Sequence, residues 1–409
     1  MAFATKAYAQ TVPQETGSFA AAVPPLDLSG KLATHTGVVA DAQESAMVTE
    51  GSSEAMASAI SMYEEIVAQG GWRKLPQGKL QKGIKSNAVV ALRERLVRES
   101  YMDIDALSVA DPQTYDGMLI GAVRNFQINH GIAPTGKIDN RTRAAMDVPA
   151  QHRLFMLQDN QPRIEAYGQG LGGRNILVNI PSVQLELVEL GKVYARHNIC
   201  CGKLDRPTPT LASKVTDVTF NPTWSAPASI VEKDIIPKYL KDPGYLDSLN
   251  IHVFDGVGGP EIDPSTVDWE NTPADRYHFL QAPGDQNALA TVKVNFKNPF
   301  MVYMHDTPHR ELFAQNNRYQ SSGCVRVENV RAFINWILAG QDGFDEAQFE
   351  MITATQETTV MPVHNVIDVR FMYLTAWATE DGHVNFRPDV YQLDGAGFIY
   401  GQPDPVGSA

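Results

Sequence analysis

The chain has 409 residues, of which 43% are hydrophobic and 20% are charged, and its formal net charge is −13. This length predicts two or three domains, and the composition is typical of a globular protein with a large core. The acidic balance argues against nucleic acid or an anionic lipid surface as the main partner. No stretch of the sequence approaches the roughly 20 apolar residues of a membrane span.

Residues 1–45 are rich in Ala, Thr, Ser, Gly and Pro, without sustained periodicity. We therefore expect a flexible leader there. Ala7, Tyr8 and Ala9 resemble a signal-peptidase site, but only nine residues precede the cut, too few for a charged and an apolar region. A signal peptide has therefore either been trimmed from this version or is absent.

Residues 46–79 contain a predicted helix over 53–68. Its apolar residues recur at i, i+4, i+7 and i+11, which places them on one face, and Gly70 and Gly71 end the run. These apolar residues are Met56, Ile60, Tyr63 and Val67. We interpret the segment as a helical scaffold.

Residues 80–150 carry three helical patterns, over 88–99, over 115–130 and from Thr142 onward. The apolar stripe of the second helix is Tyr115, Met118, Leu119, Ala122, Val123 and Phe126. The motifs V-x-x-L-R-x-R-L, A-V-x-x-F-Q-x-x-H-G and G-x-I-D-x-x-T-x-x-A-M resemble the peptidoglycan-binding domain type 1, a small three-helix module. The resemblance implies binding to glycan strands, and the alternative is a generic helical bundle that packs internally.

A scaffold or linker helix is predicted over 151–172, after which the period changes from helical to strand-like. Residues 173–395 therefore form a mostly β domain, followed by a tail over 396–409. Its predicted strands are 175–180, 183–190, 192–199, 215–220, 290–296, 299–304 and a run within 363–379. Between two of these strands, residues 225–287 form an insertion of about 65 residues, a length that is usually functional or disordered.

The three cysteines do not make a disulfide framework. Cys200 and Cys201 are adjacent in a strand-like run, so their side chains should face opposite ways. We interpret both as structural.

Cys324 and His305 are the candidate catalytic residues. A strand predicted over 300–304 places His305 where a strand gives way to a loop, and a helix predicted over 327–338 places Cys324 near its N-terminus. A neighbouring imidazole and a helix N-terminus each lower the pKa of a thiol. The alternative for any single His or Cys is a packed residue without chemistry.

The tetrapeptide S-S-G-C supplies a possible oxyanion site. Gly323 lets the backbone approach a reacting carbonyl closely, so the successive amides of Ser322, Gly323 and Cys324 can point at a developing negative charge. A nucleophile, a base and an anion site together predict acyl transfer.

The pattern H-x-T-P, then a gap, then S-x-G-C-x-R resembles the signature of the L,D-transpeptidase (YkuD-type) catalytic domain, and most closely its large multidomain Gram-negative branch. Further motifs, such as F-N-P-x-W, Q-x-P-G-x-x-N-A-L and D-G-x-V-x-F-R, extend the resemblance over about 53–395. One departure is Ser322, where many members carry His. The implied fold class is α+β and multidomain: a mostly β catalytic domain with an inserted lid, preceded by the helical peptidoglycan-binding domain and helical scaffold segments.

The resemblance also implies where a substrate binds. The insertion resembles a lid over the substrate cleft, with Tyr277, Gln281 and Asn287 as candidate substrate contacts. Tyr303, before the catalytic histidine, is a further candidate. For Arg326 two interpretations stay open, a clamp on a substrate carboxylate and a structural ion pair.

A second group must orient the His305 ring. The Asp306 carboxylate is one candidate, but adjacent side chains at a strand end point apart, so we favour a backbone carbonyl. His309 lies four residues after His305, and the intervening Pro308 disfavours the helix that would align both as metal ligands. We therefore expect neither a metal nor a cofactor.

The implied activity is 3→3 cross-linking of peptidoglycan stem peptides. A tetrapeptide donor would acylate Cys324 with loss of D-alanine, an acceptor stem would take the acyl group, and carbapenem-type β-lactams would inactivate the thiol. The same residues leave open an L,D-carboxypeptidase or amidase, attachment of a protein to the wall, exchange of the terminal D-amino acid, and a non-catalytic wall-binding scaffold. The substrate implies a periplasmic location and possible cell-wall synthase partners.

Overall fold

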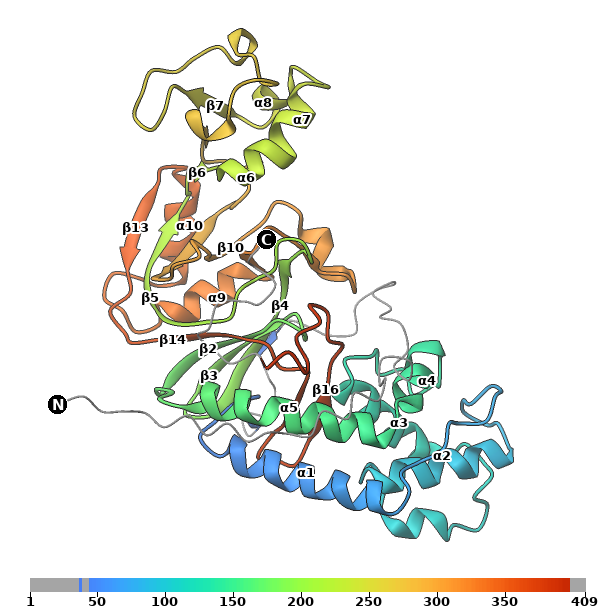
Figure 1. Ribbon diagram of the computed structural model, residues 1–409. Helices are drawn as coiled ribbons and strands as arrows, with labels where there is room; N and C mark the ends of the chain where they lie inside the picture. Colours follow the sequence, from blue (N-terminus) through green and yellow to red (C-terminus); the bar gives the residue numbers. More distant parts are fainter. Residues whose placement is uncertain (1–36, 39–43, 398–409) are drawn as a thin grey trace, which may run out of the picture.

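The computed structural model describes residues 37–38 and 44–397 (Figure 1). Most of the predicted leader and most of the tail lie outside the described residues. Within the leader, β1 (Gly37–Val38) pairs antiparallel with β4 (Lys192–Gly202). The leader prediction is wrong for these two residues, because the long strand β4 offers backbone groups with which they pair.

Two long helices, α1 (Ser52–Ala68) and α5 (Ala150–Gly168), lie side by side below the main sheet in Figure 1. Met56 and Tyr63 on α1 and Leu157 on α5 are buried in one core, which also includes β15 (Ala376–Ala378) and β16 (Val384–Phe386). This confirms the helix predicted over 53–68. Among the described residues, no helix combines the length and the apolar character needed to cross a membrane.

The helical module contains α2 (Asn87–Arg98), a short 3-10 helix η2 (Ile104–Leu107), α3 (Gly117–Asn129) and α4 (Asn140–Asp147). The apolar stripe of α3 is buried as predicted, except for Met118, which is 57% exposed. Asp116 caps α3 by accepting from the Leu119 N–H at 2.9 Å. The buried positions from Leu119 onward follow helical spacing, and Met118 lies one position outside that stripe.

Arg387 fixes the module to the scaffold. Its Nη1 donates to the Asn129 carbonyl at 2.7 Å, and His130 stacks on Phe386 at 5.4 Å between ring centroids. Gly131 has φ +63°, and a side chain there would come within 2.8 Å of the Arg387 guanidinium. These contacts join the C-terminal end of α3 to the strand pair β15–β16.

The main sheet positions the candidate catalytic residues and closes on itself. Its strands run in the order β4-β12-β10-β9-β5-β14-β2-β3, and β3 pairs again with β4. The strands besides β4 are β2 (Arg174–Asn179), β3 (Gln184–Glu189), β5 (Leu211–Phe220), β9 (Val292–Phe296), β10 (Met304–His305), β12 (Val325–Val327) and β14 (Asp368–Met372). Two further strands, β11 (Tyr319–Ser321) and β13 (Thr359–Pro362), pair with β4 and β5. A single apolar core fills this domain.

The predicted strand over 300–304 is wrong for all but its last residue. Asn298 uses its side-chain amide to bind the Val302 carbonyl at 2.8 Å and its side-chain carbonyl to accept from the Val302 N–H at 3.1 Å. Met301 has φ +55°. The asparagine side chain thus folds these residues into a turn in place of a strand ladder.

The helix predicted over 327–338 begins later than expected. Its observed form is α9 (Val330–Ile337), and a second helix, α10 (Glu346–Ala354), follows. Val325 and Val327 are fully buried while the residue between them is not, which is the alternation of a strand, β12. Cys324 therefore precedes a strand and not a helix.

Residues 224–287, called the insertion below, lie at the top of Figure 1 and have an apolar core of their own, which includes Val231, Trp269 and Phe279. The strands of the insertion are β6 (Trp224–Ser225), β7 (Ile251–Phe254) and β8 (His278–Gln281), which form one small sheet. Its helices are α6 (Ala228–Ile230), the π-helix η3 (Val231–Ile235), α7 (Ile236–Tyr239), α8 (Tyr245–Ser248), and the 3-10 turns η4 (Pro264–Thr266) and η5 (Ala274–Arg276). One further 3-10 helix, η6 (Arg310–Ala314), lies between β10 and β11.

Candidate active site

Four residues on neighbouring strands lie in register across the sheet: Lys293 on β9, His305 on β10, Arg326 on β12 and Cys200 on β4. Paired residues on adjacent strands turn their side chains to the same face of a sheet. The residues between them turn into the apolar core. One face of the sheet therefore carries an imidazole between two cationic side chains.

Tyr303 lies two residues before His305, and Cys324 lies two residues before Arg326. The Val325 N–H donates to the Tyr303 carbonyl at 3.0 Å, which aligns the two segments. The backbone N–H and the hydroxyl of Tyr303 both lie close enough to the Cys324 sulfur to lower the pKa of its thiol. The ring of Tyr303 also meets the His305 ring edge-on, at 5.6 Å between centroids. Tyr303 thus contacts both candidate catalytic residues.

Cys324 and His305 lie on the same face, two positions apart along adjacent parallel strands. From ordinary strand spacing and rise, their Cα atoms are about 8 Å apart. A thiol and an imidazole can span this separation. The strand register therefore places the predicted nucleophile and the predicted base on one face of the sheet.

His305 is held in one tautomer. Its Nδ1 lies 2.5 Å from the Asp306 carbonyl oxygen, so Nδ1 carries the proton and Nε2 keeps its lone pair. This confirms the expected backbone carbonyl as the orienting group. The Asp306 carboxylate points elsewhere and accepts from the Thr291 hydroxyl at 2.7 Å and the Thr307 N–H at 2.8 Å.

Electrostatics keep the His305 ring neutral. Burial is the largest cause, followed by the positive charge of Arg326, and with a smaller effect of Lys293 they lower the pKa of His305 to about 3. The hydrogen bond to Asp306 acts in the opposite direction. At neutral pH the imidazole is therefore a base with a free Nε2.

Burial raises the pKa of the Cys324 thiol above its ordinary value. The backbone N–H and the hydroxyl of Tyr303 and the charges of Lys293 and Arg326 lower it, but by less in sum. The helix N-terminus that the sequence suggested does not contribute, because α9 begins only at Val330. The resting pair is thus a thiol and a neutral imidazole, and the thiol loses its proton as it reacts.

The turn before Cys324 is fixed by the Ser321 hydroxyl, which donates to the Cys324 carbonyl at 2.6 Å and accepts from the Gly323 N–H at 3.2 Å. Gly323 has φ +113°, which disfavours any other residue there. Its amide is therefore occupied, contrary to the predicted oxyanion role. Within residues 44–397, the amides of Ser322 and Cys324 donate to no protein acceptor, and these two fit that role.

The Arg326 guanidinium makes no ion pair or hydrogen bond with any of the described residues, and its Nε is buried. Burial lowers its pKa, and the nearby thiols and the Glu311 carboxylate act in the opposite direction. A partly buried cation without an ion-pair partner is costly unless a ligand supplies the counter-charge. Of the two interpretations for Arg326, the structure favours the carboxylate clamp.

Gln281 and Asn287 are buried, and their side-chain amides form hydrogen bonds within the protein. Asn287 donates to the Pro222 and Ala282 carbonyls at 3.0 and 2.9 Å, and Gln281 accepts from the Ala288 N–H at 2.8 Å. These contacts tie the ends of the insertion together, so the expectation of substrate contact is corrected to a structural role. Tyr277 packs edge-on against Trp269 within the insertion.

Cys200 and Cys201 are fully buried free cysteines on opposite faces of β4. Burial raises the pKa of Cys200 to about 11, and it raises the pKa of Cys201 further. Neither thiol is suited to react, as the sequence suggested.

Two residues of this site were not predicted from the sequence to contact the candidate catalytic residues. Trp224, the first residue of the insertion, lies close to the Tyr303 hydroxyl. Arg206, in the loop between β4 and β5, bonds Ser322 and an acidic residue of the insertion. Their partners are far along the chain, so no spacing rule could have identified them.

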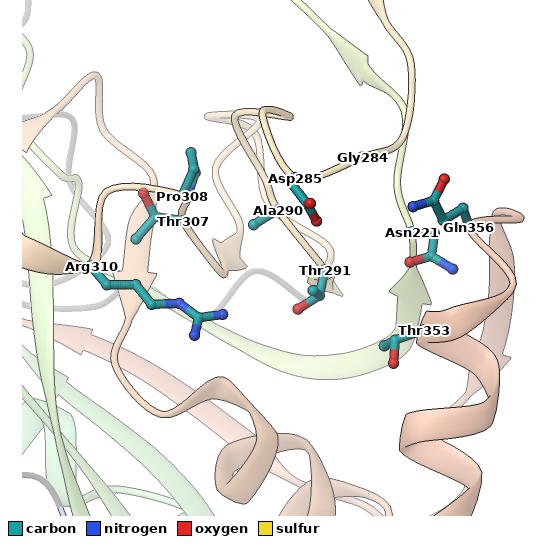
Figure 2. A pocket seen from close by; sticks show the side chains of 10 residues that line it. All are labelled: Asn221, Gly284, Asp285, Ala290, Thr291, Thr307, Pro308, Arg310, Thr353 and Gln356. Atoms are coloured by element: carbon teal, nitrogen blue, oxygen red, sulfur yellow. The ribbon is translucent and has the colours of Figure 1, made fainter.

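A polar cavity of about 260 Å³ lies beside the segment that follows His305. Figure 2 shows Thr307, Pro308 and Arg310 on one side and Asn221, Thr353 and Gln356 on the other, with Asp285, Ala290 and Thr291 between them. Neither Cys324 nor His305 lines it. Among the described residues, no three His, Cys, Asp or Glu side chains are grouped as metal ligands would be.

Comparisons with known proteins identify relatives of two parts of the chain. Residues 173–355 match the model of the YkuD family, described as "L,D-transpeptidase catalytic domain", and residues 85–146 match a family described as "Putative peptidoglycan binding domain". A protein of Haemophilus influenzae named "Putative L,D-transpeptidase" is 36% identical over 220 residues, which cover 54% of this chain and 44% of that protein. The chain thus matches less than half the length of this relative.

Two solved structures are also similar. An L,D-transpeptidase from Xylanimonas cellulosilytica has a TM-score of 0.24 and 16% identity, over 72% of this chain and 98% of that chain. An L,D-transpeptidase (Yku) from Stackebrandtia nassauensis has a TM-score of 0.25 and 13% identity, over 73% and 96%. TM-scores this low do not establish a shared fold, so the family assignment depends on the sequence matches. On those matches, residues 173–355 are an L,D-transpeptidase catalytic domain of the YkuD family, preceded by a domain of the peptidoglycan-binding family.

Proposed function

We propose that this protein is a peptidoglycan L,D-transpeptidase that forms 3→3 cross-links through a cysteine thioester. The observation that carries the proposal is the joint placement of Cys324 and His305 on one sheet face. Tyr303 lies beside the sulfur, and the His305 Nδ1–H donates a hydrogen bond to the Asp306 carbonyl. This arrangement leaves Nε2 as the acceptor of the thiol proton.

In the first half-reaction, His305 Nε2 takes the proton of Cys324 as the sulfur attacks the carbonyl of the third stem residue, a diaminopimelate at its L-centre. The amides of Ser322 and Cys324 hold the oxyanion. The C–N bond to D-alanine breaks, the departing amine takes the proton back from His305, and a thioester remains. Arg326 binds a carboxylate of the donor stem.

In the second half-reaction, the side-chain amine of an acceptor stem attacks the thioester and gives its proton to His305. The C–S bond breaks, and the sulfur recovers a proton from the imidazolium. Atoms and charge balance without a cofactor. The insertion serves as the lid of the substrate cleft, residues 80–150 bind glycan strands, and the reaction takes place in the periplasm beside the cell-wall synthases.

The test is incubation with purified disaccharide-tetrapeptide and mass spectrometry of the products, with Cys324→Ala, His305→Gln and Cys200→Ala in parallel. We expect a 3→3 dimer with wild type and Cys200→Ala, and none with the other two variants. Tripeptide without dimer would replace the proposal with an L,D-carboxypeptidase. Full activity of Cys324→Ala would refute the thioester.

A further inference from the structure

The insertion contacts the thiol turn through two separate relays. In the first, the Trp224 indole lies close to the Tyr303 hydroxyl and lowers its pKa, and that hydroxyl lies close to the Cys324 sulfur. In the second, Arg206 binds both Asp234 on η3 and the hydroxyl of Ser322. Both relays reach residues that surround the reacting sulfur.

Arg206 holds its two partners with the same guanidinium. Its Nη1 lies 2.5 Å from Asp234 Oδ2 and 3.0 Å from Ser322 Oγ, and its Nη2 lies 3.4 Å from Asp234 Oδ1. The Arg206 side chain is only 14% exposed. Asp234 is 34% exposed, so the ion pair is partly buried, and the bidentate contact adds geometric specificity to it.

The loop that carries Arg206 is packed against the turn before Cys324. The Thr208 hydroxyl donates to the Gly323 carbonyl at 2.9 Å and accepts from the Gly202 N–H at 2.8 Å. A side chain at Gly202 would come within 2.2 Å of the Arg206 carbonyl. The loop is therefore packed against both β4 and the thiol turn, and Arg206 joins it to Asp234 on η3.

We propose that Arg206 is a positioning residue that couples the placement of the insertion to the arrangement of the Ser322–Cys324 turn. Through Asp234 it holds the insertion over the thiol, and through Ser322 it orients the peptide whose amide faces the oxyanion. Loss of Arg206 therefore has two opposite effects. The sulfur becomes more accessible to small reagents, while acyl transfer becomes slower.

The test measures thiol access first and rests on the proposed function only in taking Cys324 as the reacting thiol. Wild type, Arg206→Met, Asp234→Asn and the double variant are treated with iodoacetamide, and the modified cysteines are counted by mass spectrometry. We expect Cys324 to be alkylated roughly tenfold faster in each variant, because a lost charge-assisted contact shifts an equilibrium by about that factor. The double variant should be no faster than either single one.

Three controls make the result specific. Asp205→Asn removes a neighbouring carboxylate that lies 3.8 Å from Arg206 and is mostly exposed, and it should leave the rate unchanged. Arg206→Lys should restore part of the wild-type protection. Cys200 and Cys201 are fully buried, so they should stay unmodified. Alkylation of all three cysteines in Arg206→Met would show general unfolding and overturn the proposal.

Ser322→Ala separates the two effects. It keeps the ion pair with Asp234, so alkylation should stay at the wild-type rate, while kcat of acyl transfer falls and KM changes little. Unchanged alkylation in both Arg206→Met and Asp234→Asn would overturn the proposal. The alkylation assay needs no peptidoglycan, so it remains decisive even if the enzyme proves not to cross-link stems.

Discussion

His305 and Arg326 lie directly opposite each other on the parallel strands β10 and β12, with their side chains on one face of the sheet. Burial is the main reason that the imidazole stays neutral at physiological pH, and the positive charge of Arg326 adds to it. The same cation forms no ion pair with a carboxylate among the described residues. One side chain therefore both helps to keep the base neutral and is available to a substrate carboxylate.

Lys293 is expected to influence the pKa values of both His305 and Cys324. Its charge lowers the pKa of His305 and the pKa of Cys324, so Lys293→Met should raise both. We expect a shift of up to about one pH unit in each titration. The pH dependence of Cys324 alkylation and the NMR titration of His305 measure the two shifts. Lys297→Met, at an exposed position after β9, is the matched control, and an equal shift there would contradict a local effect.

Arg326→Met should weaken catalysis without weakening the fold. Because no carboxylate among the described residues forms an ion pair with Arg326, thermal stability should stay constant or rise. Loss of a charge-assisted contact to the donor should lower kcat/KM roughly 30-fold or more. Arg331→Met removes ion pairs to Glu346 and Glu350 on the surface and should leave kcat/KM unchanged. A large loss of stability in Arg326→Met would instead favour a structural ion pair.

Asn287→Ala should destabilise the protein and spare substrate binding. The substitution removes the donor for the Pro222 and Ala282 carbonyls, and it removes the acceptor of the Leu289 N–H at 2.8 Å. Leaving these buried groups unpaired should cost about 2–3 kcal/mol of unfolding free energy, measurable by urea denaturation. Tyr277→Phe should have a small effect on stability. A normal stability with a raised KM would restore Asn287 as a substrate contact.

Stability should fall in acid partly because of His305. Its folded pKa, about 3, is below its unfolded value of about 6.5, so its contribution is present above pH 6.5 and is lost as pH falls toward 3. Between pH 6.5 and 5 this amounts to about 2 kcal/mol. Urea denaturation of His305→Gln should therefore show a shallower decline over that range than wild type. His309→Gln, at an exposed position, should decline as wild type does.

The sequence predicted the elements whose patterns are local. The helix over 53–68 and most strands of the main sheet have clear periodicity, and His305 was expected at the end of a strand, as it is. The strand over residues 325–327 was not predicted, and Val327 was assigned to a helix because the apolar spacing of α9 continues into it. The partner strands of these residues, β10 and β4, are distant in sequence, so the pairing that makes them a strand is not visible locally.

The candidate catalytic residues could be predicted from the sequence, whereas the residues that hold them in place could not. Cys324 and His305 carry a recognisable motif, whereas the contacts of Arg206 depend on an ion pair to a residue of the insertion. Gln281 and Asn287 lie in a motif that suggested ligand contact. Their side-chain amides donate hydrogen bonds to backbone carbonyls of the same segment, and this folding back of the chain is visible only in the structure.

The pairing of β5 with β9 has a consequence for how such proteins diversify. These strands pair antiparallel up to Phe220 and Val292, and the Asn221 N–H donates to the Thr291 carbonyl at 2.8 Å, so they already meet as a hairpin. The insertion is an enlarged tip of that hairpin with a separate apolar core. Evolution can lengthen, shorten or exchange this tip as a unit while the strands below keep their register. Preference for one acceptor over another can therefore change without altering the residues that break and form bonds.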